Sequence, residues 1–323
     1  MDKMITEKNA EWIYEYAYAP GSVWEKWRDD DGEPEWLPGE AEKTARRVKK
    51  ELPGFLLLAD SHFAYNGTWD DTVAAMREVS KRVSLSGIIH LGDMTDGLLP
   101  AAETEVLERR IITDMQSLGM SVYLVPGNHD YNYFKGNPEI RYPARPQYYV
   151  DLPEYKVRLI FIDSFDPKEP LRYGFTDYCI HWLDAVLYMM PAGFHAIVFS
   201  HVPPLVRLQV WTQDIRNRDK LVKVLDRYAG KILAYINGHN HCDHLFNDLH
   251  NGSFPVISVN CAKCEYFTEY KPEGAVVPPR RLGDRTQESF DIMQVDTKNE
   301  AIYFTRFGAG SDRAVLNHKA VWI

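Results

Sequence analysis

The chain has 323 residues, and its 37 Lys and Arg residues against 46 Asp and Glu residues give a formal net charge of −9 with histidine neutral. This balance argues against a protein that binds nucleic acids or membrane surfaces nonspecifically, because both kinds of binding depend on a basic surface. Apolar residues make up 45% and charged residues 26% of the chain, which argues against disorder, a collagen-like repeat or a coiled coil as the organisation of the whole chain.

No apolar run in the sequence approaches the roughly 18 residues that a membrane-spanning helix requires. We therefore expect a soluble, cytoplasmic protein that does not contact the membrane. The four cysteines, which are too few for a disulfide framework in a chain of this length, are Cys179, Cys242, Cys261 and Cys264. The last two have C-x-x-C spacing, but no second such pair exists, so reduced cysteines are favoured over a redox or zinc site.

Residues 1–52 differ in composition from the rest of the chain. Four tryptophans are spread there among charged and turn-forming residues: Trp12, Trp24, Trp27 and Trp36. A stretch this short is not expected to build a core of its own. We predict an N-terminal extension that packs its aromatic side chains on a neighbouring surface, and a main domain over residues 53–323.

From Phe55 onward, short runs rich in Leu, Ile and Val alternate with segments of helical periodicity. The apolar runs cover residues 55–59, 88–91, 121–125, 157–162, 196–200 and 232–236. Helices are predicted near residues 69–83, 102–118, 177–190 and 213–229, with Thr68 and Thr176 as N-caps of the first and third. This alternation predicts an α/β fold in which helices cover a largely parallel sheet.

The pattern changes again after Pro279. Two apolar runs, residues 290–296 and 301–307, are separated by a short polar segment. This arrangement predicts a C-terminal β-hairpin, whose antiparallel strands complete a sheet late in the chain.

Polar side chains follow five of the apolar runs, at the point where each run ends. In chain order these residues are Asp60 and His62, Asp93 and Asp96, Asn128 and His129, His201, and His239 and His241. The carboxyl ends of parallel strands meet at one edge of a sheet, so residues far apart in the sequence converge there. The first three groups are spaced by about one βαβ unit, which predicts that they lie side by side.

Imidazole, carboxylate and amide ligands together suit Mn, Fe, Co, Ni or Zn better than they suit calcium or magnesium. Apart from Asp96 and His129, the group offers four histidines, two aspartates and one asparagine, which exceeds what one ion needs. Two divalent ions that share a carboxylate would use all seven. Any one of these residues alone would more often be a polar residue that caps a turn, but that explanation would have to hold for all seven at once.

Several neighbouring residues leave alternatives open. His90 lies inside an apolar run, which favours a hydrogen-bonded sheet histidine over a ligand. Asp130 either positions His129 or caps a loop. Residues 131–134 either form a substrate-facing wall or pack as a lid. Residues 242–244 are expected to support the last ligand pair from the loop instead of binding metal themselves.

The ordered set of D-x-H, G-D-x-x-D, G-N-H-D, a single H and G-H-x-H, over residues 55–241, resembles the calcineurin-like metallophosphoesterase superfamily. The resemblance implies a four-layer αββα core, in which two sheets are flanked by helices. It also implies two metal ions, with Mn, Fe or Zn favoured and Co or Ni also suitable. The implied ligands are Asp60, His62 and His241 for the first ion, Asn128, His201 and His239 for the second, and Asp93 as the bridge.

The same resemblance assigns roles in catalysis. His129 matches the histidine that faces the leaving-group oxygen, and Asp96 matches the aspartate that orients this histidine. The implied nucleophile is a metal-bridging hydroxide. Purple acid phosphatases have a tyrosine ligand where this chain has Asp96, so a tyrosinate-bound iron(III) is not expected. Protein phosphatases carry arginines where this chain has residues 97–98 and 125–126, so phosphoprotein substrates lose support.

We therefore expect a metal-dependent phosphoesterase that acts on a small or medium-sized phosphodiester or phosphomonoester. The absence of the phosphate-clamping arginines favours the diester, which carries less negative charge. Two alternatives stay open. A nuclease of the same superfamily is disfavoured by the acidic balance and by the lack of a basic run beside the motifs. A noncatalytic metal-binding module, which would dock a partner through the Trp-rich extension, is disfavoured because every ligand is present. The sequence does not indicate an oligomeric state.

Overall fold

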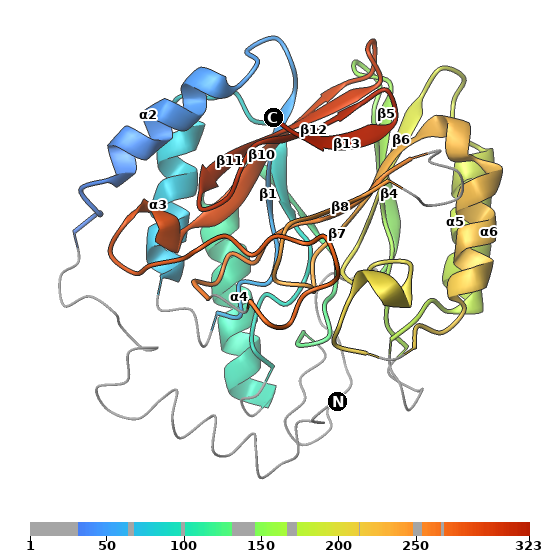
Figure 1. Ribbon diagram of the computed structural model, residues 1–323, viewed down its shortest axis with the longest axis horizontal. Helices are drawn as coiled ribbons and strands as arrows, with labels where there is room; N and C mark the ends of the chain where they lie inside the picture. Colours follow the sequence, from blue (N-terminus) through green and yellow to red (C-terminus); the bar gives the residue numbers. More distant parts are fainter. Residues whose placement is uncertain are drawn as a thin grey trace.

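The chain folds into two mixed β-sheets that pack face to face between two groups of helices (Figure 1). The computed structural model describes residues 32–63, 68–97, 101–130, 146–166, 173–212, 214–247, 254–265 and 268–323. None of the helices in this part of the chain combines the length and the apolar character that crossing a membrane requires.

The first sheet has seven strands in the order β13-β12-β11-β10-β1-β2-β3. Their bounds are β1 Gly54–Leu58, β2 Gly87–His90, β3 Ser121–Leu124, β10 Ser289–Asp296, β11 Ala301–Gly308, β12 Arg313–Leu316 and β13 Lys319–Trp322. Strands β1, β2 and β3 are parallel neighbours. The late strands β10 to β13 are antiparallel, and β10 pairs directly with β1.

The second sheet has six strands in the order β4-β5-β6-β7-β9-β8. Their bounds are β4 Tyr148–Leu152, β5 Val157–Phe161, β6 His195–Ser200, β7 Ile232–Asn237, β8 His244–Phe246 and β9 Val256–Ser258. Strands β5, β6, β7 and β9 are parallel, whereas β4 and β8 pair antiparallel at the two edges.

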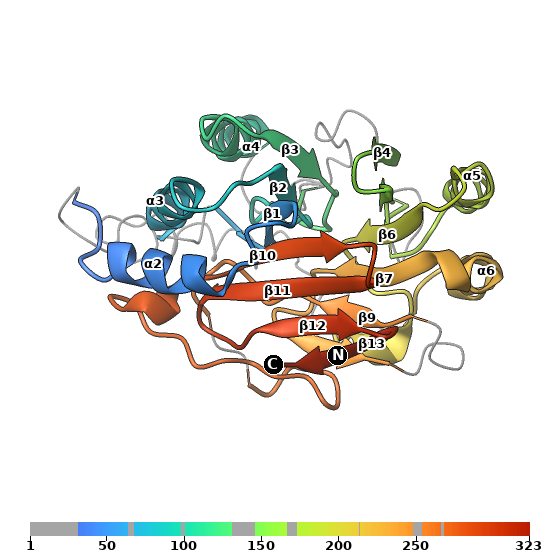
Figure 2. The same ribbon diagram turned by 90° about the horizontal axis from the view of Figure 1, so that it is seen from above.

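Helices cover the outer face of each sheet, as the view from above makes clear (Figure 2). Their bounds are α2 Leu37–Arg47, α3 Trp69–Ser80, α4 Ala101–Gln116, α5 Asp177–Tyr188 and α6 Arg218–Arg227. Helices α2, α3 and α4 pack on the first sheet, and α5 and α6 pack on the second. Short 3-10 helices cover Val206–Leu208, Ala229–Lys231 and Arg285–Gln287.

Three apolar layers hold these parts together. In β1, Phe55 and Leu57 enter the layer between the two sheets, whereas Leu56 and Leu58 pack under the helices of the first sheet. All four side chains are fully buried, and burying each contributes roughly 1.5–3 kcal/mol relative to leaving it in water. Because both faces of this strand are covered, its sequence is a continuous apolar run. The four-layer αββα architecture implied by the sequence is confirmed.

The predicted strands and helices are largely confirmed. The six apolar runs form β1, β2, β3, β5, β6 and β7, and the late hairpin forms β10 and β11 in the expected antiparallel register. At the start of α5, the side chain of Thr176 accepts a hydrogen bond from the amide of Cys179. All four cysteines are free thiols.

Three predictions about these elements were wrong in part. Both sheets are mixed: the antiparallel strands β10 to β13 join the first sheet beside β1, and β4 and β8 pair antiparallel at the edges of the second. Helix α6 begins at Arg218 and not near residue 213, because Arg216 pairs with Tyr173 and Phe175 and Asn217 adopts a left-handed conformation with φ of 60°. Helix α3 begins after Thr68 as predicted, but the side chain of Thr68 makes no capping hydrogen bond.

Part of the predicted N-terminal extension is described. Helix α2 lies within it and packs against α3 and β11. Next to its start, the ring of Trp36 lies 6.4 Å from that of Phe307, centroid to centroid. The other three tryptophans of the extension, Trp12, Trp24 and Trp27, lie outside the described residues.

Candidate metal centre

The predicted ligands lie in the loops that follow strands of both sheets, at one common edge. Strands β1, β2 and β3 of the first sheet and β6 and β7 of the second lead into these loops. The structure brings together all seven side chains that the sequence singled out, and they come from positions up to 181 residues apart: Asp60, His62, Asp93, Asn128, His201, His239 and His241.

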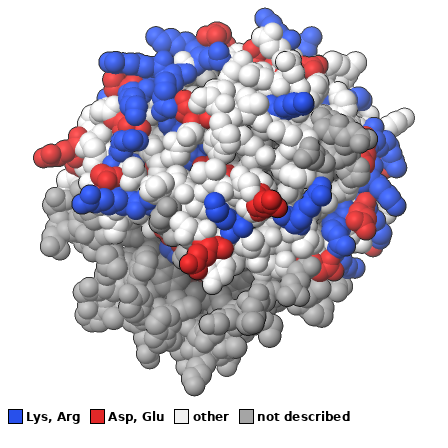
Figure 3. Space-filling view, in the orientation of Figure 1, with Lys and Arg blue, Asp and Glu red and all other residues white. Residues whose placement is uncertain are grey.

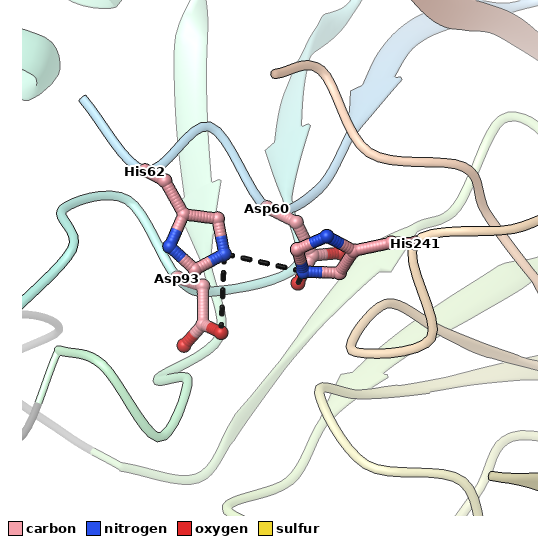
Figure 4. Close-up of side chains that lie close together, drawn as sticks. All are labelled: Asp60, His62, Asp93 and His241. Carbon is pink, nitrogen blue, oxygen red and sulfur yellow. Dashed lines mark hydrogen bonds and ion pairs between the residues drawn. The ribbon is translucent and has the colours of Figure 1, made fainter. Parts of the chain in front are cut away.

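A first group consists of Asp60, His62, Asp93 and His241, whose ligand atoms lie within 4.8 Å of one another (Figure 4). The Nε2 atoms of His62 and His241 face each other at 3.2 Å. The Nε2 atom of His241 lies 3.5 Å from Oδ1 of Asp60, and that of His62 lies 3.7 Å from Oδ2 of Asp93. Two imidazole nitrogens and two carboxylates thus surround one small volume.

A second group consists of Asp93, His201 and His239, joined by Asn128. The side-chain oxygen of Asn128 lies 3.1 Å from Nε2 of His201 and 3.0 Å from Nδ1 of His239. The Nε2 atom of His201 also lies 3.2 Å from Oδ2 of Asp93. Oδ2 of Asp93 therefore faces both groups, as a shared carboxylate requires.

The donor set fits a cation in each group. The Nδ1 atom of His201 donates to the carbonyl of Leu91 over 2.7 Å, which leaves Nε2 as the nitrogen that can hold a proton or a metal ion. Among the described residues, the neighbours of that Nε2 atom are acceptors or other ring nitrogens: Asn128 Oδ1, Asp93 Oδ2, His239 Nδ1 at 3.3 Å and Asp60 Oδ1 at 3.9 Å. Such a cluster of buried lone pairs is stable only with positive charge at its centre. Nitrogen and oxygen donors in this mixture suit borderline divalent metals.

The backbone is strained at these positions. Five of the seven residues have positive φ, although none is glycine: Asp60 (54°), His62 (44°), Asp93 (53°), His239 (69°) and His241 (51°). Such conformations cost on the order of 1–3 kcal/mol each and concentrate at functional sites. The turns that follow the strands thus trade stability for the direction in which these side chains point.

Two glycines let the loops approach one another. A Cβ atom on Gly127 would lie within 3.0 Å of the amide nitrogen and Oδ1 of Asp93, and one on Gly238 would lie 2.9 Å from Oδ2 of Asp60. The glycines in G-N-H-D and G-H-x-H are therefore required by close packing of backbone against a ligand carboxylate.

Asp130 fixes the loops after β2 and β3 relative to each other. Its carboxylate accepts hydrogen bonds from the amides of Asp93 and Met94 at 2.9 Å and from that of Gly127 at 2.8 Å. Burial, together with the nearby Asp93, raises the pKa of Asp130 to about 7. The contacts favour the capping alternative for Asp130, since they join two loops.

The pKa values of the histidines reflect their surroundings. Burial lowers the pKa of His62 and of His239 well below the usual range, so both imidazoles are neutral and can offer a lone pair to a cation. His201 behaves differently: burial opposes its protonation, but the Asp93 carboxylate outweighs this and raises the pKa of His201 to about 9. In the metal-free chain a proton on His201 offsets the carboxylate charge that a divalent cation would otherwise neutralise.

His129 lies beside the first group. Its ring meets that of His62 edge-on, with centroids 4.6 Å apart, and its Nδ1 atom contacts the main-chain carbonyl of Asp96. This contact assigns the proton to Nδ1 in the neutral ring and leaves Nε2 for a substrate. Burial lowers the pKa of His129 from its ordinary value, with Asp93 acting in the opposite direction. In this contact Asp96 offers its backbone carbonyl to His129.

The sequence did not single out Glu265 and Lys263, which follow β9. The Oε1 atom of Glu265 contacts Nδ1 of His241, and its Oε2 atom pairs with Nζ of Lys263 at 2.7 Å. Trp211 was also missed; its ring stacks on Tyr270 with centroids 5.6 Å apart and meets His241 edge-on at 6.3 Å. No motif spacing marks these residues, because they reach the site from loops of irregular length.

Two other residues near the site lie as the sequence analysis expected. His90 is fully buried in β2, and its Nε2 atom bonds to the hydroxyl of Ser61 at 2.8 Å. Asp243 supports its loop by pairing with the buried Arg306 and Arg313. Residues 131–134, the proposed substrate wall or lid, lie outside the described residues.

Solved structures of related fold support this picture at the level of the fold. A dimetal phosphatase from Danio rerio aligns with a TM-score of 0.63 and 16% identity over 82% of this chain and 99% of that one. The purple acid phosphatase PPD1 from yellow lupin (Lupinus luteus) aligns with a TM-score of 0.55 and 11% identity over 85% of this chain and 53% of that one. GAP50, named as the anchor in the inner membrane complex of Plasmodium, aligns with a TM-score of 0.53 and 15% identity over 84% of this chain and 88% of that one.

At these identities the likeness establishes the fold alone. A search of curated protein sequences gave no match. A family model described as calcineurin-like phosphoesterase matches residues 54–243, which is more than half of the chain and includes every predicted ligand. On this match, and with the double-sheet fold in place, the chain belongs to the calcineurin-like phosphoesterase family.

Proposed function

We propose that this chain hydrolyses a phosphoester with the help of two divalent metal ions. One ion would be held by Asp60, His62 and His241, the other by Asn128, His201 and His239, with Asp93 between them. The observation that carries the proposal is the convergence of these buried donors on two adjoining volumes, with one carboxylate oxygen common to both. Family membership supplies the reaction class.

Each part of the site has a task in this reaction. When bound, a pair of divalent ions lowers the pKa of water and neutralises charge on the phosphoryl oxygens. The chain itself orients the ligands, since Asp130 ties together the loops that carry Asp93 and Asn128. His129, held at Nδ1, would present Nε2 to the leaving-group oxygen and, as the imidazolium, donate the Nε2 proton to it. The donor set of imidazole, carboxylate and amide favours Mn, Fe or Zn, while Co and Ni also fit.

We further propose that the substrate is a phosphodiester of small or medium size. A phosphomonoester carries a second negative charge, which other branches of the superfamily meet with arginines near the site. Here Val125 and Pro126 precede Gly127, and the ammonium group of the nearby Lys263 is paired with Glu265. A diester therefore suits the charge of this site better.

Hydrolysis assays test both statements. The metal-free chain would be supplied with Mn²⁺ and offered bis(4-nitrophenyl) phosphate and 4-nitrophenyl phosphate at equal concentration. We expect metal-dependent release of 4-nitrophenolate from both, and faster release from the diester. Faster hydrolysis of the monoester would reverse the proposed preference, and no hydrolysis of either by a chain that holds two ions would favour the noncatalytic module.

Nucleic acid is a poor candidate for the substrate. On the face seen in Figure 3, basic side chains gather over α2, but acidic side chains lie among them. Arg46 of this helix pairs with Glu42, and Arg47 pairs with Asp312. A backbone-binding surface needs basic groups free to contact phosphates. Salt-sensitive binding of DNA would revive the nuclease alternative.

A further inference from the structure

The segment after β9 lies along the end of β1, directly beside the candidate metal centre. The amide of Ala262 donates to the carbonyl of Ala59 over 2.7 Å, and that of Lys263 donates to the carbonyl of Asp60 over 3.3 Å. A further turn bond, from the amide of Glu265 to the carbonyl of Lys263 at 2.9 Å, directs Glu265 back toward the site. The backbone at Asp60, a candidate ligand, thus fixes the position of this segment.

Glu265 uses its carboxylate to join a candidate ligand to a lysine. Its Oε1 atom contacts Nδ1 of His241, and its Oε2 atom lies 2.7 Å from Nζ of Lys263. The Glu265 side chain is only 7% exposed and that of Lys263 15%. A carboxylate buried to this extent is costly unless it is paired with an opposite charge. Here Oε1 meets Nδ1 of His241, and Oε2 lies beside the ammonium charge of Lys263.

A carboxylate only accepts hydrogen bonds, so its contact requires that Nδ1 of His241 carries a proton. The lone pair of His241 is then on Nε2, which lies 3.5 Å from Oδ1 of Asp60 and 3.2 Å from Nε2 of His62. Resting on the function proposed above, we propose that Glu265 is a positioning residue: it fixes the tautomer and ring orientation of His241 and so strengthens binding of the ion at Asp60 and His62. Lys263 supplies the charge that allows this carboxylate to be buried.

Cys261 offers a competing explanation, because its sulfur, Nδ1 of His241 and the Glu265 carboxylate also lie within 4.8 Å of one another. A metal ion bound there would face the ammonium group of Lys263, which already pairs with Glu265. The thiol of Cys261 donates instead to the carbonyl of Lys263 over 3.2 Å. The charges and contacts therefore favour a hydrogen-bonded carboxylate over a third metal site.

The proposed effect is confined to one of the two ions. In the second group, the corresponding support for His201 is the backbone carbonyl of Leu91, which a side-chain substitution does not remove. A change at Glu265 should accordingly weaken the binding of one ion and leave the affinity for the other unchanged. A general loss of structure would weaken the binding of both ions.

Mn²⁺ binding to the full chain tests this asymmetry without reference to activity. Equilibrium dialysis with metal analysis would be carried out on the metal-free wild type, Glu265→Leu and Glu265→Gln, with Glu269→Gln, an exposed carboxylate of the same region, as the matched control. In Glu265→Leu we expect one of two ions to bind about 10–100-fold more weakly. In Glu265→Gln the amide oxygen can still accept from Nδ1–H, so we expect most of this loss to be restored.

Circular dichroism and thermal unfolding of the metal-free variants would establish that each is folded. If Glu265→Leu does not fold, the comparison of the two Mn²⁺ affinities is made on Glu265→Gln, in which a small residual weakening of one ion's binding is expected. Wild-type affinity for both ions in Glu265→Leu, or equal weakening of both ions in either Glu265 variant, would overturn the proposal. A third bound ion in the wild type that disappears in Glu265→Leu would overturn it too, because Glu265 would then be a ligand. A wild type that binds two ions yet hydrolyses no phosphoester would contradict the proposed function and leave the role of Glu265 supported.

Discussion

The main-chain N–H of His129 donates to Oδ1 of Asp93 over 2.8 Å. This bond occupies one oxygen of the Asp93 carboxylate and leaves the other, Oδ2, facing both groups of candidate ligands. It also couples the backbone of the proposed acid to the residue that would lie between the two ions. A movement of the His129 backbone therefore also moves the Asp93 carboxylate.

Asp93→Asn tests the shared carboxylate. The amide has nearly the same shape and can still accept from the amide of His129, but it lacks the charge that two cations require. We expect the affinity for both Mn²⁺ ions to fall by more than about 100-fold, because changes outside the ligand set alone cost about 10–100-fold. Equilibrium dialysis measures this directly, and retention of either ion at wild-type affinity would argue against a bridging role.

His129→Asn tests the proposed acid. We expect two bound Mn²⁺ ions as in the wild type, with kcat lowered by about 10²–10⁴-fold. The loss should be smaller for 4-nitrophenyl esters than for alkyl esters, because 4-nitrophenolate departs readily without a proton. Steady-state kinetics on a matched aryl and alkyl pair provides the comparison. An equal loss for both leaving groups would point to a role in binding instead of proton donation.

Gly127→Ala tests the close approach of the loops after β2 and β3. Its Cβ would lie within 3.0 Å of the amide nitrogen and Oδ1 of Asp93, so the loop must move. We expect the free energy of unfolding to fall by about 1–3 kcal/mol and Mn²⁺ affinity to fall with it. Gly230→Ala is the control, since a Cβ there meets nothing within 4 Å and should cost less than about 0.5 kcal/mol. Urea unfolding of both variants would decide, and equal stability would count against the packing argument.

Glu288 makes stability depend on pH. It is fully buried and accepts from the hydroxyl of Thr72 at 2.7 Å, and burial raises its pKa from 4.5 to about 7. Between these values the folded chain keeps the proton and the unfolded chain releases it. The free energy of unfolding therefore falls as pH rises from 4.5 to 7, by on the order of 3 kcal/mol from this group.

Glu288→Gln should remove most of that dependence, because the amide has no proton to lose in this range. Urea unfolding at pH 5 and pH 8 would be compared for the wild type, Glu288→Gln and the exposed control Glu269→Gln. We expect the control to match the wild type. A variant that loses as much stability as the wild type over this interval would show that Glu288 does not hold its proton.

The residues that follow the strands could be predicted because strand ends determine where they lie. Apart from residues 121–125, whose first three side chains are exposed or partly buried, these apolar runs are almost entirely buried. The end of each run is evident in the sequence, and the residues just beyond it must reach the common edge of the sheets. The same reasoning placed His90 inside a strand and away from the ligand set. In contrast, α2, the edge strands β4, β8 and β13 and the inner strands β9 and β12 were missed, since short or half-exposed elements lack a long continuous apolar run.

The supporting residues of the site could not be predicted for a different reason. Glu265 and Trp211 reach His241 through loops whose course depends on tertiary packing, and neither stands at a fixed distance from a strand end. Likewise, the early start predicted for α6 followed from helical periodicity, whereas Asn217 precedes the helix in a left-handed conformation beside Arg216, whose backbone pairs with Tyr173 and Phe175. Local patterns specify the elements, and contacts between loops specify how the ligands are held.

The most direct test of the account is an anomalous diffraction measurement on crystals of the chain grown with Mn²⁺. We expect two peaks about 3.5–4 Å apart, one beside Asp60, His62 and His241 and the other beside Asn128, His201 and His239, with the Asp93 carboxylate between them. A single peak, or peaks away from these side chains, would contradict the proposed two-metal centre.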